Sequence, residues 1–280
     1  MKINCFGDSL TAGTAFGNTL SYPQKLRQLT GLEVNNYGIG GENSLTIAAR
    51  IGALPLTAYM DNCADGKMYS VRLRTSDGRA PELLRQVQDD TGNDLVNPVT
   101  IKGISGTLSR QGDMLFFAPD GGFIRTPCEA EVSTCLSASD FSNDINIFWA
   151  GTNDYTSMSN VGQVMGNICA MIDFCGSEKY LVLGLTALEY MPEVDEVNEV
   201  LSEKFGDRFL NFRSYLFENI MTIEDVKLDR EDIKMLQQGD IPYCLIKAPQ
   251  YDHVHGNEQF FDLLGRCVYD KLQELGYLNV

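Results

Sequence analysis

The chain has 280 residues, of which 44% are hydrophobic, enough for one large folded unit or for one unit with an insertion. Its net charge of −16 argues against a nucleic-acid partner, because binding to the phosphate backbone requires clusters of lysine and arginine. The chain starts in an apolar segment without the pattern of a signal peptide, and its most apolar later stretch, residues 180–188, is too short to cross a membrane. We therefore expect a cytoplasmic protein without a membrane span.

The eight cysteines are spread through the chain, with no C-x-x-C pair among them. A chain of this size without an export signal more often carries reduced, buried thiols than disulfides. A structural zinc site would need closely spaced cysteine or histidine ligands. We therefore expect free thiols, no bound metal and no other cofactor.

Strands and helices alternate in the first part of the chain. Ser21, followed by Pro23, indicates the start of a helix, and Gly31 indicates its end. The predicted elements are, in order, a strand over residues 3–6, this helix, a strand over 32–36, a glycine-rich turn over 38–41 and a helix over 45–51. Such alternation predicts a parallel sheet that is covered by helices.

The rhythm changes between residues 54 and 143. Short alternating runs at 68–73, 99–101 and 114–117 are separated by turn sequences such as Asp77-Gly78. This pattern predicts a small all-β insertion, interrupted by a helical piece over residues 81–88.

The alternation of strands and helices then resumes. Residues 193–203 are acidic, but their apolar side chains recur at helical spacing, which predicts an amphipathic helix with a solvated charged face. The predicted elements are strands over residues 145–149, 180–185 and 209–212, and helices over 161–174, 193–203, 229–238 and 258–275.

The chain has only two histidines, and both lie in the string of residues 252–257. Hydrolases that work near neutral pH commonly use an imidazole as their base. At the other end of the chain, the string Gly7-Asp8-Ser9 directly follows the first predicted strand, which places Ser9 at a strand-to-loop turn. The two ends together predict a serine nucleophile, a histidine base and a carboxylate that orients the histidine.

Four short strings that contain these residues occur in a defined order. They are Gly7-Asp8-Ser9-Leu10, Asn36-Tyr37-Gly38-Ile39-Gly40-Gly41-Glu42, Gly151-Thr152-Asn153-Asp154 and Asp252-His253-Val254-His255. In this order the strings resemble those of the SGNH family of GDSL-type esterases and lipases. The resemblance implies a flavodoxin-like, three-layer α/β fold with a parallel sheet, formed by residues 1–53 and 144–280. The small all-β subdomain, residues 54–143, would be inserted into it.

The same resemblance assigns roles to individual residues. Ser9 would be the nucleophile, His255 the general base and acid, and Asp252 the carboxylate that orients His255. The oxyanion hole would consist of the backbone N–H groups of Ser9 and Gly41 and the side-chain amide of Asn153. No metal or cofactor is implied.

His253 has more than one interpretation. The spacing from Asp252 in the family selects His255 as the base, so we expect His253 to have a structural or substrate-contacting role. Two alternatives remain open: His253 competes as the base, or it forms a metallohydrolase site with Asp252 and His255.

These observations favour a serine esterase that hydrolyses small acyl esters, acetyl esters above all, through an acyl-serine intermediate. A carbohydrate ester is the favoured substrate, because the β insertion lies between two of the motif strings, where it could wall the site. Alternatives are a lysophospholipase or thioesterase-type acyl hydrolase and a non-catalytic glycan-binding or phage-related module. The sequence does not predict the oligomeric state.

Overall fold

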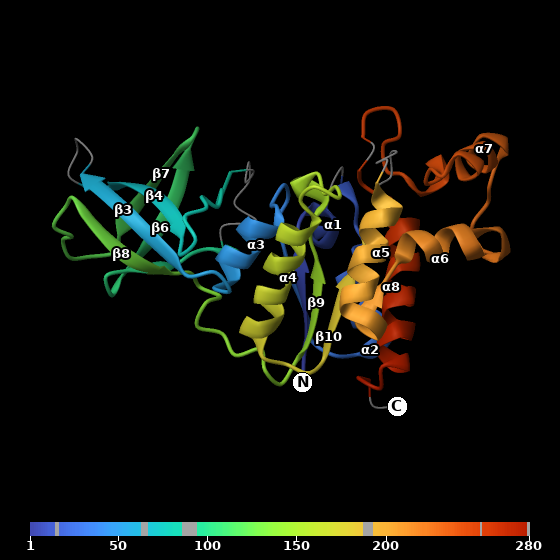
Figure 1. The fold of residues 1–280 in the computed structure, drawn as a ribbon, viewed down its shortest axis with the longest axis horizontal. Coiled ribbons are helices and arrows are strands. Elements are labelled where there is room, and N and C mark those ends of the chain that lie inside the picture. Colours follow the sequence, from blue (N-terminus) through green and yellow to red (C-terminus); the bar gives the residue numbers. More distant parts are fainter. Residues whose placement is uncertain (15–16, 63–66, 86–93, 187–192, 253, 279–280) are drawn as a thin grey trace.

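The computed structural model describes residues 1–14, 17–62, 67–85, 94–186, 193–252 and 254–278. It contains two separate sheets (Figure 1). The first is an open sheet whose strands are, in spatial order, β11 (Phe209–Leu210), β10 (Tyr180–Leu183), β9 (Ile145–Trp149), β1 (Ile3–Gly7) and β2 (Val34–Gly38). Every pairing in it is parallel, as the alternation of strands and helices predicted.

Helices cover both faces of this parallel sheet. One face packs against α3 (Ser44–Ile51), α4 (Val161–Cys175) and α5 (Val194–Phe205), and the other against α2 (Tyr22–Thr30), α6 (Phe212–Asn219) and α8 (Glu258–Glu274). Successive side chains of a strand point in opposite directions, so Cys5 of β1 joins the core on the α8 side and Phe6 joins the core on the α3 side. The other described α-helices are α1 (Ser9–Ala12) and α7 (Arg230–Gln238).

The second sheet is a closed barrel of antiparallel strands. Its spatial order is β3 (Leu56–Asn62), β4 (Tyr69–Thr75), β7 (Met114–Pro119), β6 (Ile104–Gln111), β5 (Val99–Ile101) and β8 (Cys128–Ser133), and β8 pairs with β3. Along β4, Val71 and Leu73 are buried in the barrel core, whereas Arg72 and Arg74 are exposed. The barrel lies at one end of the molecule, beside α3 (Figure 1). The alternating runs at 68–73, 99–101 and 114–117 all form barrel strands.

The helix predicted over residues 81–88 is wrong where the structure describes it. Residues 81–85 contain a turn and no helix, and residues 86–88 lie outside the described part of the chain. Leu84 has a φ of 61°, in the left-handed region that a right-handed helix cannot contain. Leu83 and Leu84 are buried in the barrel core, so the packing of these two leucines overrides the local helical pattern.

The strand predicted over residues 209–212 is shorter than expected. It ends at Leu210, because Asn211 is the N-cap of a helix, α6, that the sequence pattern did not indicate. The Asn211 side chain accepts a hydrogen bond of 3.1 Å from the backbone N–H of Ser214, which is the usual cap of a helix N-terminus.

The cysteines that the structure describes are free thiols, as predicted, while Cys63 lies outside the described residues. Burial raises the pKa of the Cys5 and Cys175 thiols to about 12, which keeps both protonated and unreactive. Within the described ranges, no helix is long and apolar enough to cross a membrane.

Candidate active site

Three side chains from distant parts of the chain form one hydrogen-bonded series. The Nε2 atom of His255 lies 2.7 Å from Oγ of Ser9, and its Nδ1 atom lies 2.7 Å from Oδ2 of Asp252. A carboxylate can only accept, so the hydrogen of the imidazole belongs on Nδ1, and Nε2 is then the acceptor for the Ser9 hydroxyl. The structure thus brings together the three residues for which the sequence predicted nucleophile, base and orienting roles. In this arrangement the imidazole is able to take a proton from the serine.

Ser9 lies at a tight turn between β1 and α1. Asp8 caps this short helix, and its Oδ1 atom accepts a hydrogen bond of 2.9 Å from the backbone N–H of Leu10. Gly7 is needed before the turn, because a Cβ atom there would lie 2.6 Å from the carbonyl oxygen of Trp149. The hydroxyl of Ser9 is therefore held at the carboxyl end of a central strand, where open parallel sheets place their sites.

The loop that carries His255 is fixed on both sides. The His255 carbonyl accepts a hydrogen bond of 3.0 Å from the backbone N–H of Lys247. Asn257 caps α8 through the backbone N–H of Phe260 and donates its side-chain amide to the Cys244 carbonyl at 2.7 Å. Gly256 leaves room for the Phe260 ring, which a Cβ atom at this position would overlap. The imidazole is thus supported by a braced segment of chain.

The predicted oxyanion-hole residues lie beside Ser9. Gly41 has a φ of 73°, a conformation that favours glycine, in the turn after β2. A Cβ atom on Gly40 would lie 3.8 Å from Cβ of Ser9, so this turn and the serine are neighbours. Asn153 lies in a single turn of 3₁₀ helix after β9, Thr152–Asp154. Gly41 and Asn153 therefore both follow the carboxyl ends of strands that flank β1.

The side-chain amide of Asn153 holds two of these segments together. Its Nδ2 atom donates to the Glu42 carbonyl oxygen at 2.9 Å and to Oδ2 of Asp8 at 3.3 Å. Both hydrogens of the amide are therefore engaged in the free protein, the one toward Asp8 more loosely. An amide donates hydrogen bonds without carrying a charge, so this group is suited to receive a developing negative charge.

Asp8 is a buried carboxyl group, with an exposed fraction of 1%. Burial raises its pKa to about 7, and the negative charges of Asp154 and Glu42 act in the same direction, against the hydrogen bond from Leu10. The folded state consequently holds a proton on Asp8 that the unfolded chain releases near pH 4.

This shift makes stability depend on pH. A raised carboxyl pKa contributes stability that is fully present below about pH 4 and is lost as the pH rises through 7, because between these two values the folded state binds more protons than the unfolded chain. The variant Asp8→Asn keeps an oxygen for the Leu10 N–H and has no charge to bury. We expect the Tm of the wild type to fall relative to that of Asp8→Asn between pH 5 and pH 9. Thermal unfolding of both proteins across this range measures the difference, and a constant difference would contradict the raised pKa.

Glu42, the residue after Gly41, forms a buried ion pair with Arg50 that was not predicted from the sequence. Nε of Arg50 contacts both carboxylate oxygens of Glu42, at 3.1 and 2.9 Å, and its Nη2 atom donates to the Tyr37 carbonyl at 2.7 Å. Arg50 is fully buried, and Glu42 is 5% exposed. The spacing of eight residues between the two charges, across a helix start, was the only signal in the sequence.

The metallohydrolase alternative depends on His253, which lies outside the described residues. Among the residues that the structure describes, no group of three histidine, cysteine or carboxylate side chains is placed to hold a metal ion. The role of His253 stays a prediction.

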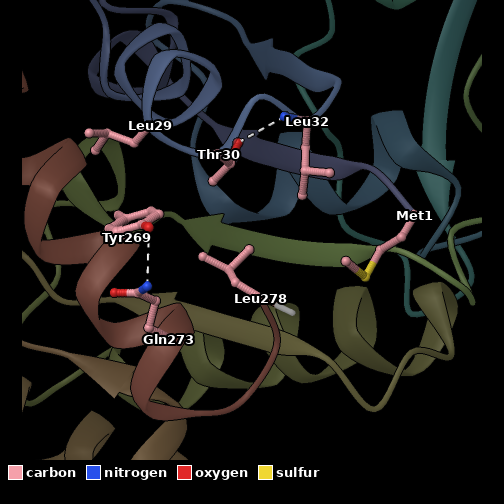
Figure 2. A pocket seen from close by; sticks show the side chains of 7 residues that line it. All are labelled: Met1, Leu29, Thr30, Leu32, Tyr269, Gln273 and Leu278. Atoms are coloured by element: carbon pink, nitrogen blue, oxygen red, sulfur yellow. Dashed lines mark hydrogen bonds between the residues drawn. The ribbon is translucent and has the colours of Figure 1, made fainter. Parts of the chain in front are cut away.

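Figure 2 shows a hollow in another part of the molecule. Its described lining consists of Met1, Leu29, Thr30, Leu32, Tyr269, Gln273 and Leu278, which include neither a histidine nor a carboxylate. Met1 precedes β1 and Ser9 follows it, and a strand of five residues spans about 17 Å. This hollow is therefore at the opposite edge of the sheet from the candidate site.

A serine, an imidazole and a carboxylate in series at the carboxyl end of a parallel sheet form the constellation of hydrolases with a serine nucleophile. The family model described as GDSL-like Lipase/Acylhydrolase matches residues 3–266 of this sequence. The chain belongs to this family of hydrolases.

Two of the solved structures that are similar to this chain come from bacteria. One, from Desulfitobacterium hafniense DCB-2, is 14% identical with a TM-score of 0.45, and the match covers 97% of this chain and 99% of the other. The second, from Veillonella parvula DSM 2008, is 14% identical with a TM-score of 0.48 and covers 96% and 97%. Both are described as proteins of the lipolytic G-D-S-L family. No curated protein matched the sequence.

Proposed function

We propose that this protein is a serine ester hydrolase in which Ser9 is the nucleophile, His255 the general base and acid, and Asp252 the residue that orients His255. The observation that supports the proposal most strongly is the continuous hydrogen-bonded series of these three side chains, with 2.7 Å at both contacts. Residues 54–143, which contain the barrel strands, are proposed as a subdomain inserted into the catalytic unit.

The reaction proceeds in two balanced steps. Nε2 of His255 takes the proton of Ser9 while Oγ attacks the ester carbonyl, and the same proton is then given to the departing alcohol, which leaves an acyl-Ser9 ester. Water, activated by His255 in the same way, attacks the acyl-enzyme and releases the carboxylic acid. No cofactor takes part in this scheme.

Three donors are proposed for the oxyanion that forms in each step. Ser9 is the first residue of α1, so its backbone N–H has no acceptor within the helix. The backbone N–H of Gly41 and the side chain of Asn153 complete the set. Asn153 would exchange its longer hydrogen bond, that of 3.3 Å to Asp8, for one to the oxyanion.

We propose small acyl esters, acetyl esters of carbohydrates above all, as the substrates. Two tyrosines close in sequence to site residues support this choice: Tyr155 and Tyr251 are both 83% exposed, and Tyr251 directly precedes Asp252. Tyr155 follows Asn153 by two residues and has a φ of 48°, which is rare for a large side chain and points to a functional placement. Exposed aromatic rings offer flat apolar faces with a polar tip, a combination that suits the face of a sugar ring.

The test is hydrolysis of p-nitrophenyl esters from acetate to octanoate, together with release of acetate from acetylated oligosaccharides. We expect kcat/KM to be highest for acetate, oligosaccharide acetates to be cleaved, and a chelator to have no effect. An organophosphonate should label Ser9 in the intact protein. A maximum at octanoate would favour the lysophospholipase or thioesterase alternative, chelator-sensitive activity the metallohydrolase, and failure to label Ser9 would contradict the proposed nucleophile.

A further inference from the structure

The barrel contacts the helices of the parallel sheet through an arginine. Arg79 lies in the turn that follows β4, and its Nη1 atom donates a hydrogen bond of 3.0 Å to Oδ1 of Asn167 on α4. Asn167 is 4% exposed and the Arg79 side chain is 33% exposed, so this contact is partly buried. The two residues are 88 positions apart in the chain. A charged side chain of the barrel thus ends at a buried amide of the α/β unit.

From Asn167 the hydrogen bonds continue to the candidate oxyanion hole. Nδ2 of Asn167 donates to Oγ of Ser44 at 2.9 Å. Ser44, the first residue of α3, donates from Oγ and from its backbone N–H to the two carboxylate oxygens of Asp154, at 2.6 and 2.8 Å. Asp154 is the next residue after Asn153. The series therefore ends at the short turn that carries the Asn153 amide.

Every link in this series runs in the same direction, and Arg79 at one end and Asp154 at the other both favour that direction. A guanidinium can only donate, so it fixes the oxygen of the Asn167 amide toward itself and the NH₂ group toward Ser44. Ser44 Oγ then accepts from Asn167, and its own hydrogen is directed to Asp154, which accepts only. Arg79 therefore favours the observed orientation of the Asn167 amide from one side, and the Ser44–Asp154 contact favours it from the other.

The turn that carries Arg79 is itself well held. Asp77 forms an ion pair with Arg79 at 2.7 Å and accepts a hydrogen bond of 2.5 Å from the Thr75 hydroxyl. The contact with Arg79 is the larger cause, and that with Thr75 the next, of a pKa of Asp77 below its usual range. Residues 54–143 make a second hydrogen bond to the α/β unit: the backbone N–H of Glu82 donates to Oγ1 of Thr46 on α3 at 3.2 Å. In Figure 1, α3 lies between the barrel and the parallel sheet.

We propose that Arg79 is a positioning residue for catalysis, through which the barrel fixes the turn that holds the Asn153 amide. This inference rests on the proposed function, in which Asn153 donates to the oxyanion. Arg79 does not contact the reacting atoms. It acts through Asn167, Ser44 and Asp154, and small displacements of a catalytic group are costly, up to about 100-fold in rate for 1 Å.

The first test compares Arg79→Ala with Arg74→Ala. Arg74 is an exposed arginine of the neighbouring strand β4, and no described residue forms an ion pair with it. We expect Arg79→Ala to lower kcat for p-nitrophenyl acetate about tenfold with little change in KM, and Arg74→Ala to leave both unchanged. Arg79→Lys, which retains donors but not the planar fork, should recover part of the loss. Asn167→Leu should reproduce the loss.

A double-mutant cycle with Asn153→Ala separates positioning from general destabilisation. If Arg79 acts through Asn153, the change Arg79→Ala costs little further in a protein that already lacks the amide. Losses that simply add, or a kcat for Arg79→Ala equal to that of Arg74→Ala, would overturn the inference. If the wild type itself shows no Ser9-dependent turnover, the proposed function fails together with this inference. An active, Ser9-dependent wild type with additive losses contradicts the role of Arg79 alone.

Discussion

Replacement of Ser9 by alanine is expected to reduce kcat for ester hydrolysis by about 10⁶-fold, and His255→Ala by a similar factor. The two residues act together. The Ser9 hydroxyl is a weak nucleophile without the imidazole at 2.7 Å, and the imidazole has no proton to take from a nucleophile without the hydroxyl. The double variant should therefore lose hardly more than either single one. Steady-state hydrolysis of p-nitrophenyl acetate measures all three proteins.

Asp252→Asn is expected to cost less, about 10⁴-fold, because the imidazole remains but its Nδ1–H loses the acceptor at 2.7 Å that orients it. Ser139→Ala, a change of an exposed serine, is the matched control and should retain full activity. Activity of Ser9→Ala within tenfold of the wild type would rule out Ser9 as the nucleophile. Strictly additive losses for Ser9→Ala and His255→Ala would show that the two residues do not act together.

Ser9, Asp252 and His255 could be predicted because they lie in short sequence strings that occur in a fixed order. Ser9 and His255 are 246 positions apart, and no local propensity connects them. The order of the four strings was the informative signal, and three of them fall at predicted loop positions. The structure places Ser9, Gly41 and Asn153 at one end of the parallel sheet, because each follows a strand and parallel strands all end on the same side.

The contacts that support the site could not be predicted in this way. Arg79 and Asn167 meet only because the barrel closes and then lies against α3 and α4, and closure depends on pairings such as that of Leu56 with Val132. Alternating apolar residues indicate that a strand exists but not which strand it pairs with. The same limit explains why the helix predicted over residues 81–88 is wrong: Leu84 packs in the barrel core, and its local sequence pattern does not show this.

Glu42→Gln is expected to destabilise the protein by about 3–5 kcal/mol, the usual cost of breaking a buried ion pair. The change keeps the size and shape of the side chain but leaves the fully buried guanidinium of Arg50 without its countercharge. Its remaining partners, such as the Tyr37 carbonyl, are neutral, and no described group accepts from Nη1. The corresponding fall in Tm is on the order of 10 °C, measurable by thermal unfolding.

The double variant Glu42→Gln/Arg50→Met distinguishes an uncompensated charge from lost packing. Removal of both charges should recover much of the stability, because the desolvation cost of the guanidinium disappears with it. Glu33→Gln, which breaks the exposed pair with Lys2, is the control and should leave the Tm almost unchanged. A double variant as unstable as Glu42→Gln would show that the pair stabilises the protein by its packing and not by its charges. Since the Glu42 carbonyl also accepts from Asn153, recovered stability without recovered kcat would show that the pair holds this turn in its active geometry.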